Sequence, residues 1–469
     1  MDARRVRRRH RQRHDPRLQR RTAAGAHRVL DRGGQGRGRR RVAGVLLTPR
    51  LLLNGDFARF WLSQVLTGVA SKSMTMVFPL LATISFAATP FEVGVVAAAQ
   101  YVPVLVVTLF IGVWLDRRPR RPTLLFTDVA GGLALLLVPV LSGLDEFHLG
   151  VLYAVAFGFG SLVAIAEVCA QAYLPSLVRG SEMVAAIGRL EAVFTLVVVA
   201  APGLGGLLMN WLGGSGAVLT GAVCYLLAAL VLCGVRRREP PVLAPVAPQR
   251  VRSEIAAGAR FLLSVPVLRT LIGQAALFNF FEQAMLTLYT VYAASVVGVT
   301  PALLGLTVTL GAVGSLLGAV TAEQAERRWG LKRVVVVSMA IASFAPVLIP
   351  LATRPTAATV TIWSLSFVLY GFGLTVYNVF STSTRQRLTP DRLRGRVAAT
   401  TRLVAYGPLS AGTLLGGGLG SLFGARSGLW ISVCLLAAAF LHFVMAMRRT
   451  RIPDLRPDPE QEQESEPAK

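Results

Sequence analysis

Lysine is scarce in this chain of 469 residues: of its 49 basic side chains, only Lys72, Lys332 and Lys469 are lysines. None of them follows a glycine, whereas the lysine of a phosphate-binding loop does, which argues against an ATP-driven pump. The chain also contains neither an HExxH nor a GxSxG pattern, which argues against an intramembrane enzyme. We therefore expect a protein that is not an enzyme.

Cysteine is also rare, with four residues in the whole chain. All four lie inside apolar runs, without a CxxC pattern or a Cys/His pairing: Cys169, Cys224, Cys233 and Cys434. We interpret them as small hydrophobic residues, which predicts neither a disulfide framework nor a metal site.

Apolar sequence, by contrast, is abundant, because 53% of the residues are hydrophobic and only 16% are charged. A run of about 18 apolar residues is long enough to cross a bilayer as a helix. Twelve such runs are centred near Lys72, Pro103, Leu135, Gly158, Val198, Tyr225, Glu282, Gly311, Ala342, Tyr370, Leu414 and Leu435. The sequence predicts an all-α integral membrane protein with twelve transmembrane helices.

Arginine placement predicts the topology. The connections after even-numbered runs are rich in arginine, whereas those after odd-numbered runs contain only Arg354 and Arg426. Positively charged loops stay in the cytoplasm, so both termini are predicted to be cytoplasmic. The preference for arginine over lysine suggests a GC-rich bacterium, and hence a bacterial plasma membrane.

Residues 1–49 carry sixteen arginines and three aspartates, which is about half of the net charge of +25. This segment could be a polybasic arm for anionic lipid or nucleic acid. It could also be a disordered N-terminal extension, or upstream sequence translated from a misassigned start. We favour the last two interpretations because the segment lacks aromatic residues and hydrophobic periodicity, and we expect no nucleic-acid partner.

A Pro- and Arg-rich segment, residues 236–265, divides the chain into two halves. We predict six-helix bundles at 50–235 and 266–447, with a cytoplasmic linker between them and a cytoplasmic tail at 448–469. The stretch LPSLVRGSEMVAAIGR in the first half resembles LTPDRLRGRVAATTR in the second, so the two bundles are expected to be pseudo-symmetric. Such repeats place a substrate site between them, near the bilayer midplane.

Several motifs resemble a known family. The pattern Gly112-x-x-x-Asp116-Arg117-x-x-Arg120-Arg121 is similar to a signature of the major facilitator superfamily, although Pro119 stands where glycine is usual. Further similarity extends over residues 50–447 and includes Ala201-Pro202-x-x-Gly205-Gly206 and Tyr377-Asn378. Together these motifs resemble the drug:proton antiporter group, which includes the enterobactin exporter and actinobacterial macrolide and tetracycline pumps. The resemblance implies the major facilitator fold.

The resemblance also implies a conformational latch at the cytoplasmic side. Asp116 would accept hydrogen bonds from the N-terminus of a helix in the other half when that side is closed. Glu167, predicted at the cytoplasmic end of span four, would pair with Arg117. The latch would comprise Gly112, Asp116, Arg117, Arg120, Arg121 and Glu167. Alternatively, the arginines serve membrane topology alone.

Two charged residues lie near the centres of apolar runs, Lys72 in span one and Glu282 in span seven. A charge at this depth costs about 2.5 to 3.5 kcal/mol, so each residue is a functional candidate. We predict that they form a pair in the central cavity, where protonation of Glu282 competes with Lys72 or with a cationic substrate. A structural salt bridge is the alternative. Asp128, nearer a helix end, is attributed to local packing.

The span-five motif with Pro202, Gly205 and Gly206 resembles an antiporter motif that accompanies export in the family. Proline permits a bend and the glycines permit close helix packing, although ordinary packing of small residues is an alternative. Polar and aromatic residues in other spans suit a bulky amphipathic or cationic substrate. They are Tyr153, Gln171, Tyr289, Trp363, Tyr370, Tyr377 and Asn378.

Together these features predict a secondary active transporter, most consistent with proton-coupled efflux of a drug-like, amphipathic or siderophore-type small molecule by alternating access. An importer or facilitator on the same fold, or a membrane sensor without transport, remains open. We expect a proton gradient instead of a cofactor, a small-molecule substrate and the lipid bilayer as partners, and a functional monomer.

Overall fold

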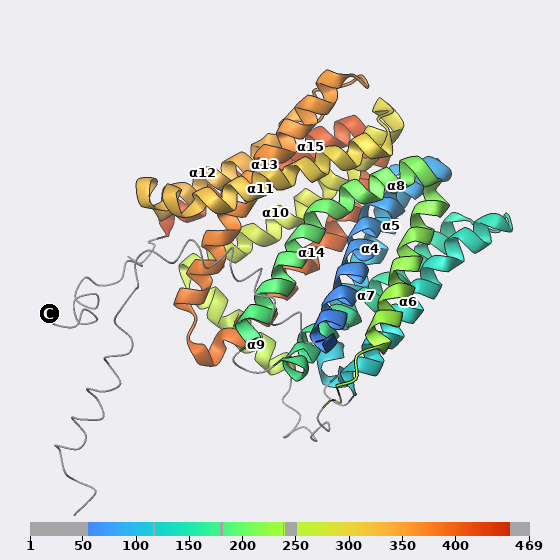
Figure 1. The fold of residues 1–469 in the computed structure, drawn as a ribbon. Coiled ribbons are helices and arrows are strands. Elements are labelled where there is room, and N and C mark those ends of the chain that lie inside the picture. Colours follow the sequence, from blue (N-terminus) through green and yellow to red (C-terminus); the bar gives the residue numbers. More distant parts are fainter. Residues whose placement is uncertain (1–54, 116–117, 179–181, 238, 240–250, 451–469) are drawn as a thin grey trace, which may run out of the picture.

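The computed structural model describes residues 55–115, 118–178, 182–237, 239 and 251–450 (Figure 1). The described part of the chain is helical and contains no strand. The predicted N-terminal extension, residues 451–469 of the predicted tail, and residues 238 and 240–250 of the predicted linker lie outside these residues. The predicted domain boundaries therefore stay predictions.

The N-terminal half, as the structure describes it, consists of helices α4 to α8. They span Gly55–Ser85 (α4), Pro90–Leu115 (α5), Arg120–Gly143 (α6), Leu149–Leu177 (α7) and Met183–Cys233 (α8). Within this half α4 packs against α8, α5 against α7, and α6 against both α7 and α8.

The C-terminal half follows the short helix α9 (Val251–Ser264). Its helices are α10 (Pro266–Val291), which continues as the π-helix η3 (Tyr292–Val297), α11 (Pro301–Trp329), α12 (Leu331–Phe344) with the 3-10 turn η4 (Ala345–Leu348), α13 (Ala357–Leu388), the 3-10 turn η5 (Asp391–Leu393), α14 (Arg394–Phe423) and α15 (Ala425–Arg449). Here α10 packs against α14 and α15, and α13 packs against α11 and α12.

Helix α8 is bent at a glycine. It contains 51 residues, and at 1.5 Å per residue a straight helix of this length would be about two and a half times as long as the bilayer core is thick. Gly213 interrupts it with φ 70° and ψ 179°, a conformation open to glycine because it has no Cβ. Figure 1 shows the two arms of α8 running in opposite directions from this bend.

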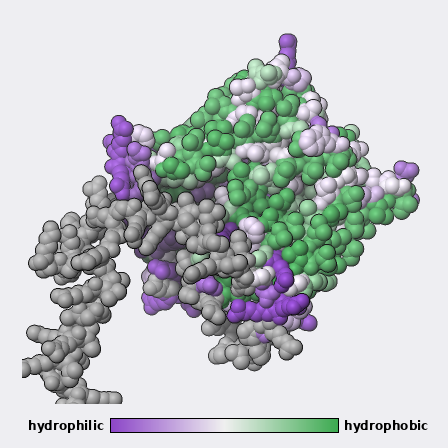
Figure 2. Space-filling view, in the orientation of Figure 1, coloured by the Kyte–Doolittle hydropathy of each residue, from purple (hydrophilic) through white to green (hydrophobic). Residues whose placement is uncertain are grey.

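The lengths and composition of the helices fit a membrane. Among the described residues eight helices are long and apolar enough to cross it, or nine if the bent pair Ala256–Ser264 and Pro266–Val297 forms one span. Their outer faces carry many exposed leucines, valines and phenylalanines. Figure 2 shows a broad apolar surface with hydrophilic residues at its edges. The chain is a multi-pass membrane protein.

Most arginines in the described ranges lie at one end of the helices, which we call the basic end. There α4 and α6 begin, α11 ends near Arg327, and α13 ends near Arg387. At the other end threonines start two helices of the C-terminal half. Thr300 accepts a hydrogen bond from the Leu303 N–H and Thr356 accepts one from the Thr359 N–H, as N-caps do.

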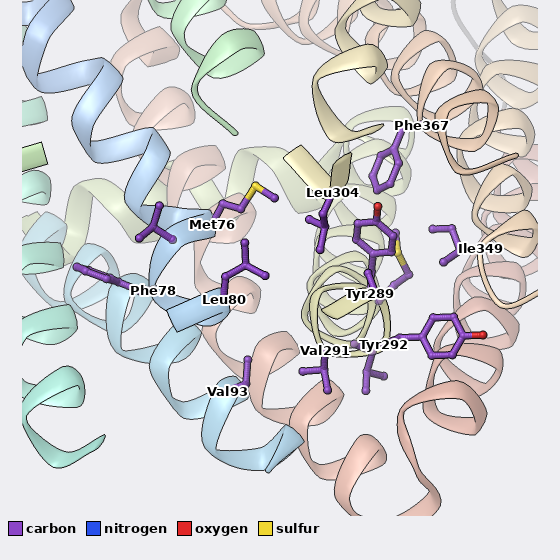
Figure 3. Close-up of a cluster of buried hydrophobic side chains, with 14 of the residues drawn as sticks. Met76, Phe78, Leu80, Val93, Tyr289, Val291, Tyr292, Leu304, Ile349 and Phe367 are labelled. Atoms are coloured by element: carbon purple, nitrogen blue, oxygen red, sulfur yellow. The ribbon is translucent and has the colours of Figure 1, made fainter. Parts of the chain in front are cut away.

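The hydrophobic core continues from one half into the other. Met76 and Leu80 of α4 belong to the same buried cluster as Val291 and Leu304 of the C-terminal half. Figure 3 shows these side chains facing one another across the boundary between the halves.

Helices of the two halves also cross closely at glycines, always toward the end opposite the basic end. Helix α5 meets α14 where Gly94 faces Gly417, and α8 meets α11 where Gly203 faces Gly305. A Cβ placed on Gly305 would lie 2.7 Å from the Pro202 carbonyl oxygen, so a larger residue does not fit without movement. The halves are therefore tightly packed at this end.

Candidate functional site

A partly exposed ion pair joins two helices of the N-terminal half. Lys72, near the middle of α4, places its Nζ 3.2 Å from Oε1 of Glu167 on α7. The same Nζ lies 5.5 Å from the centre of the Phe194 ring on α8, which permits a cation–π contact. The two side chains are 28% and 46% exposed. Neither side chain of the pair is fully buried.

This pairing corrects two predictions. Lys72 pairs with Glu167 of its own half instead of Glu282. Glu167 is also not at the helix end: ten residues of α7 follow it, which is about 15 Å of helix. Cys169, two residues further along α7, donates to the Arg120 carbonyl at the start of α6 at 3.2 Å. Arg117 lies outside the described residues, so its predicted pairing with Glu167 stays a prediction.

Glu282 has a different partner within the C-terminal half. The Tyr370 hydroxyl of α13 donates a hydrogen bond to Oε1 of Glu282 on α10. The Tyr370 ring stacks on Phe278, with centroids 6.2 Å apart and planes at 12°, and meets Phe367 edge-on. Tyr370 is held by this packing, so its hydroxyl stays directed at the carboxylate.

Two tyrosines that the sequence analysis missed lie near the charged residues. Tyr101 of α5 interacts electrostatically with both Lys72 and Glu282, and it is within hydrogen-bonding reach of Gln283. Tyr406 of α14 interacts with both Lys72 and Tyr101. A polar residue near the centre of an apolar run is the signal that identified Lys72, and it would have identified these two tyrosines as well.

Three of the predicted cavity residues instead belong to the core. The Tyr289 hydroxyl exchanges a hydrogen bond with Thr307, the Trp363 indole donates to the Ile349 carbonyl, and the Tyr377 hydroxyl donates to the Leu271 carbonyl. All three side chains are almost completely buried. Figure 3 shows Tyr289 beside Phe367 within this cluster. Their polar atoms are satisfied inside the half, so the prediction that they line the cavity is wrong for this conformation.

The other predicted cavity residues are dispersed. Tyr153 is partly buried on α7 and lies near Glu92, toward the end opposite the basic end. Gln171 and Asn378 are exposed. Only Tyr370 is joined directly to a charged residue of the candidate site.

Residues of the predicted latch are only partly described. Asp116 and Arg117 lie outside the described residues, and for Gly112 the structure describes the backbone of α5 alone. The Arg120 and Arg121 N–H groups donate to the Glu239 carboxylate at 2.7 and 2.5 Å, and the Arg121 guanidinium donates to the Cys233 carbonyl. The partners Cys233 and Glu239 belong to the end of the N-terminal half and to the segment after it. None of these contacts joins the two halves, so a latch between them stays a prediction.

The span-five motif lies at a contact with the other half. Gly206 packs against Pro301 at the start of α11, and Gly205 packs against Ser73 and Val77 of α4. The Ser73 hydroxyl also donates to the carbonyl of Ala201 at 3.0 Å, next to Pro202. Close helix packing at this motif is therefore present, and it involves both halves.

Buried Asp128 remains without a hydrogen-bond partner for Oδ2 among the described residues. It lies on α6 and is 1% exposed. The prediction of simple packing near a helix end fits its burial but does not account for its unpaired oxygen.

Comparison with protein-family models identifies the family of this chain. The family model described as Major Facilitator Superfamily matches residues 60–413. The chain belongs to the major facilitator superfamily. Members of this superfamily are transporters, so the chain is a transporter and not an enzyme, and the predicted family is confirmed.

Superfamily relatives include efflux proteins. The multidrug efflux pump Tap of Mycolicibacterium fortuitum is 28% identical over 386 residues, which cover 78% of this chain and 90% of Tap. A putative sugar efflux transporter of Deinococcus radiodurans is 26% identical over 83% of this chain and 98% of its own length.

A solved structure from the superfamily has the same fold. A bacterial homologue of the iron transporter ferroportin, in its inward-facing state, superposes with a TM-score of 0.64. The match covers 84% of this chain and 99% of the homologue at 20% identity. The fold of the described helices is thus that of the major facilitator superfamily.

Proposed function

We propose that the protein exports a drug-like, amphipathic and cationic small molecule by proton-coupled alternating access. The observation that carries this proposal is the pair of interactions near the middle of the helices, Lys72 with Glu167 in one half and Tyr370 with Glu282 in the other. Export by the relative Tap supports the direction of transport.

The proposed topology has twelve spans in two six-helix bundles. The two arms of α8 on either side of Gly213 count as two spans, and α10 with η3 counts as one. The basic end faces the cytoplasm of a bacterium, because arginine-rich loops are retained there. Both termini are then cytoplasmic.

In this topology the described conformation is inward-facing. The glycine crossings close the outer end, whereas Lys72 and Glu167 remain partly exposed. Substrate would enter from the cytoplasm or the inner leaflet. Export requires the crossings to separate and the basic ends to approach, which is the change that a latch at Asp116 would stabilise.

Glu282 is proposed to couple proton entry to substrate exit. A carboxylate at this depth is costly unless it is protonated or faces a cation. Lys72 is held by Glu167, so it is not the partner of Glu282, and a cationic substrate can take that place. Proton and substrate then compete for one carboxylate, so the site carries one or the other but not both.

A neutral, sugar-like substrate is the second candidate. It is favoured by the putative sugar efflux transporter of Deinococcus radiodurans, whose length the chain matches almost completely. The hydroxyl groups of Tyr101, Tyr370 and Tyr406 could hydrogen-bond such a molecule. In that case Glu282 would carry the proton without contacting a positive charge.

Accumulation assays in a pump-deficient bacterium test the proposal. Cells expressing the chain are loaded with antibiotics, cationic dyes and labelled sugars, with and without a protonophore. We expect the intracellular concentration of a cationic compound to stay low until the protonophore is added. In cells that express Glu282→Gln, the concentrations with and without protonophore should be equal. Glu323→Gln is the control, because Glu323 is an exposed carboxylate paired only with Arg327 along α11.

The outcomes separate the alternatives. Efflux of sugars alone would support the second candidate. Inward accumulation of a compound would indicate an importer, and binding without flux would indicate a sensor. Coupled efflux by Glu282→Gln at the rate of the unmodified protein would refute the role of Glu282.

A further inference from the structure

A second groove lies on the outside of the C-terminal half, away from the central site. It has a volume of about 400 Å³ and lies between the start of α12 and the end of α15. Its lining residues are Trp329, Lys332, Arg333, Val336, Val337, Val444, Met447 and Arg448. Neither α12 nor α15 forms a main contact with the N-terminal half, so this groove is separate from the path between the halves.

The lining residues are arranged by polarity along the helices. Lys332, Arg333 and Arg448 lie at the basic end of the groove, at the start of α12 and the end of α15. One turn further into the membrane span, α12 presents Val336 and Val337, and Val337 is 53% exposed. Met447 is 1% exposed and belongs to the buried core behind the groove. The groove is thus cationic at the basic end and apolar further along the helices.

The cations of the groove have unused hydrogen-bonding capacity. Lys332 donates to the carbonyl of Thr450 at 3.3 Å, which joins α12 to the end of α15. Among the described residues neither Arg333 nor Arg448 forms an ion pair with a carboxylate. The first turn of α12 lies at the same place, and its N-cap, Gly330, offers no side chain to the free N–H groups.

We propose that this groove binds an anionic phospholipid of the phosphatidylglycerol class. The phosphate would lie among Lys332, Arg333 and Arg448, and an acyl chain would lie along Val336, Val337 and Val444. Basic pockets between membrane helices bind such head groups through charge, while lipid chains pack on apolar surfaces. The charges and the apolar residues occur in the order in which a phospholipid presents its phosphate and its chains, which a soluble anion or a protein partner would not require.

Trp329 supplies a local reporter, because it lines the groove and is 56% exposed. The full chain is purified in detergent and titrated with phosphatidylglycerol or phosphatidylcholine carrying brominated acyl chains, which quench a nearby indole. The contribution of Trp329 is the difference from Trp329→Phe. We expect half-maximal quenching at a concentration of brominated phosphatidylglycerol at least about tenfold lower than that of brominated phosphatidylcholine.

A matched pair of variants tests the groove itself. Lys332→Gln, Arg333→Gln and Arg448→Gln together should remove the preference for phosphatidylglycerol. Arg327→Gln, Arg328→Gln and Arg449→Gln together remove the same charge from the same end, but these three arginines do not line the groove. This control variant should keep the preference for phosphatidylglycerol. Arg333→Gln and Arg448→Gln are also tested singly, because both are exposed and should leave the fold intact.

Three results would overturn the proposal. The first is equal quenching by both lipids in the unmodified chain, and the second is an unchanged preference in the groove variant. The third is displacement of brominated phosphatidylglycerol by glycerol phosphate or inorganic phosphate at equal concentration, which would indicate a site for a soluble phosphate. None of these readouts depends on transport, so failure of the proposed export leaves this test unaffected.

Discussion

Lys72 and Glu167 form an ion pair at 3.2 Å between α4 and α7, and both residues belong to the same half of the transporter. Their pairing leaves Glu282 of the other half to the hydroxyl of Tyr370. Each half thus satisfies its own central charge, and Tyr101 and Tyr406 lie within electrostatic reach of these groups. A substrate bound between the halves would meet one carboxylate from each side.

The first prediction concerns this ion pair. Glu167→Gln should reduce transport at least about tenfold, because Lys72 then faces the substrate path without a counter-charge and repels a cation. Stability should change by less than about 1 kcal/mol, since the pair is partly exposed. Efflux and thermal unfolding in detergent measure the two effects. Lys72→Gln combined with Glu167→Gln should restore part of the transport, and a double variant as inactive as Glu167→Gln would contradict this account.

The second prediction concerns the hydroxyl group of Tyr370. Tyr370→Phe keeps the stacked ring but removes the donor to Glu282, and a hydrogen bond to a charged group contributes about 1.5 to 3 kcal/mol. We expect efflux to fall about tenfold or more while expression is unchanged. Tyr377→Phe is the matched control, because the Tyr377 hydroxyl lies in the core, where it donates to the Leu271 carbonyl and lies within hydrogen-bonding reach of Ser381. Equal loss in both variants would show that Tyr370 acts through packing.

The third prediction uses two adjacent glycines of α14. A Cβ on Gly417 would lie 2.8 Å from the Pro90 carbonyl of α5, whereas a Cβ on Gly418 would meet nothing within 4 Å. Gly417→Ala should therefore destabilise the packing of the two halves opposite the basic end by about 1 to 3 kcal/mol, as overpacking does. Gly418→Ala should be neutral or slightly stabilising, because alanine favours helix. Thermal unfolding and the accessibility of an engineered cysteine in the central site are measured for both variants. Identical behaviour of the two variants would refute the close contact between α5 and α14 at Gly417.

The fourth prediction concerns the start of α6. Glu239 accepts hydrogen bonds from the N–H groups of Arg120 and Arg121, and an acidic residue at a helix N-terminus also interacts favourably with the helix dipole. Glu239→Ala should lower stability by about 1 kcal/mol. Glu323→Ala, which removes an exposed pair on α11, should have a smaller effect in the same unfolding assay. The reverse order would show that Glu239 does not cap α6.

Much of the fold follows from the sequence. Apolar runs long enough for a bilayer require helices, because a backbone without water must form its own hydrogen bonds. The motifs around Gly112 and Pro202 resembled the superfamily that the family comparison confirmed. The sequence also drew attention to Lys72 and Glu282, since a charge in an apolar run is costly wherever the helix packs.

Tertiary structure decided which residues meet. Lys72 and Glu282 each lie near the middle of a helix, but helix packing turned them toward Glu167 and Tyr370 of their own halves. Aromatic residues with a polar atom are common in binding sites, but three of those predicted here pack in the core: Trp363, Tyr289 and Tyr377. Backbone carbonyls and a threonine hydroxyl form hydrogen bonds with their polar atoms.

Hydropathy and charge along the chain are local properties, so the sequence by itself determined that this protein crosses a membrane with its arginines at one end. The direction in which a side chain points depends on the rotation and crossing of whole helices. Those are set by contacts between distant residues, such as Gly94 with Gly417 and Gly203 with Gly305. Only the folded chain could therefore decide the partners of its central charges.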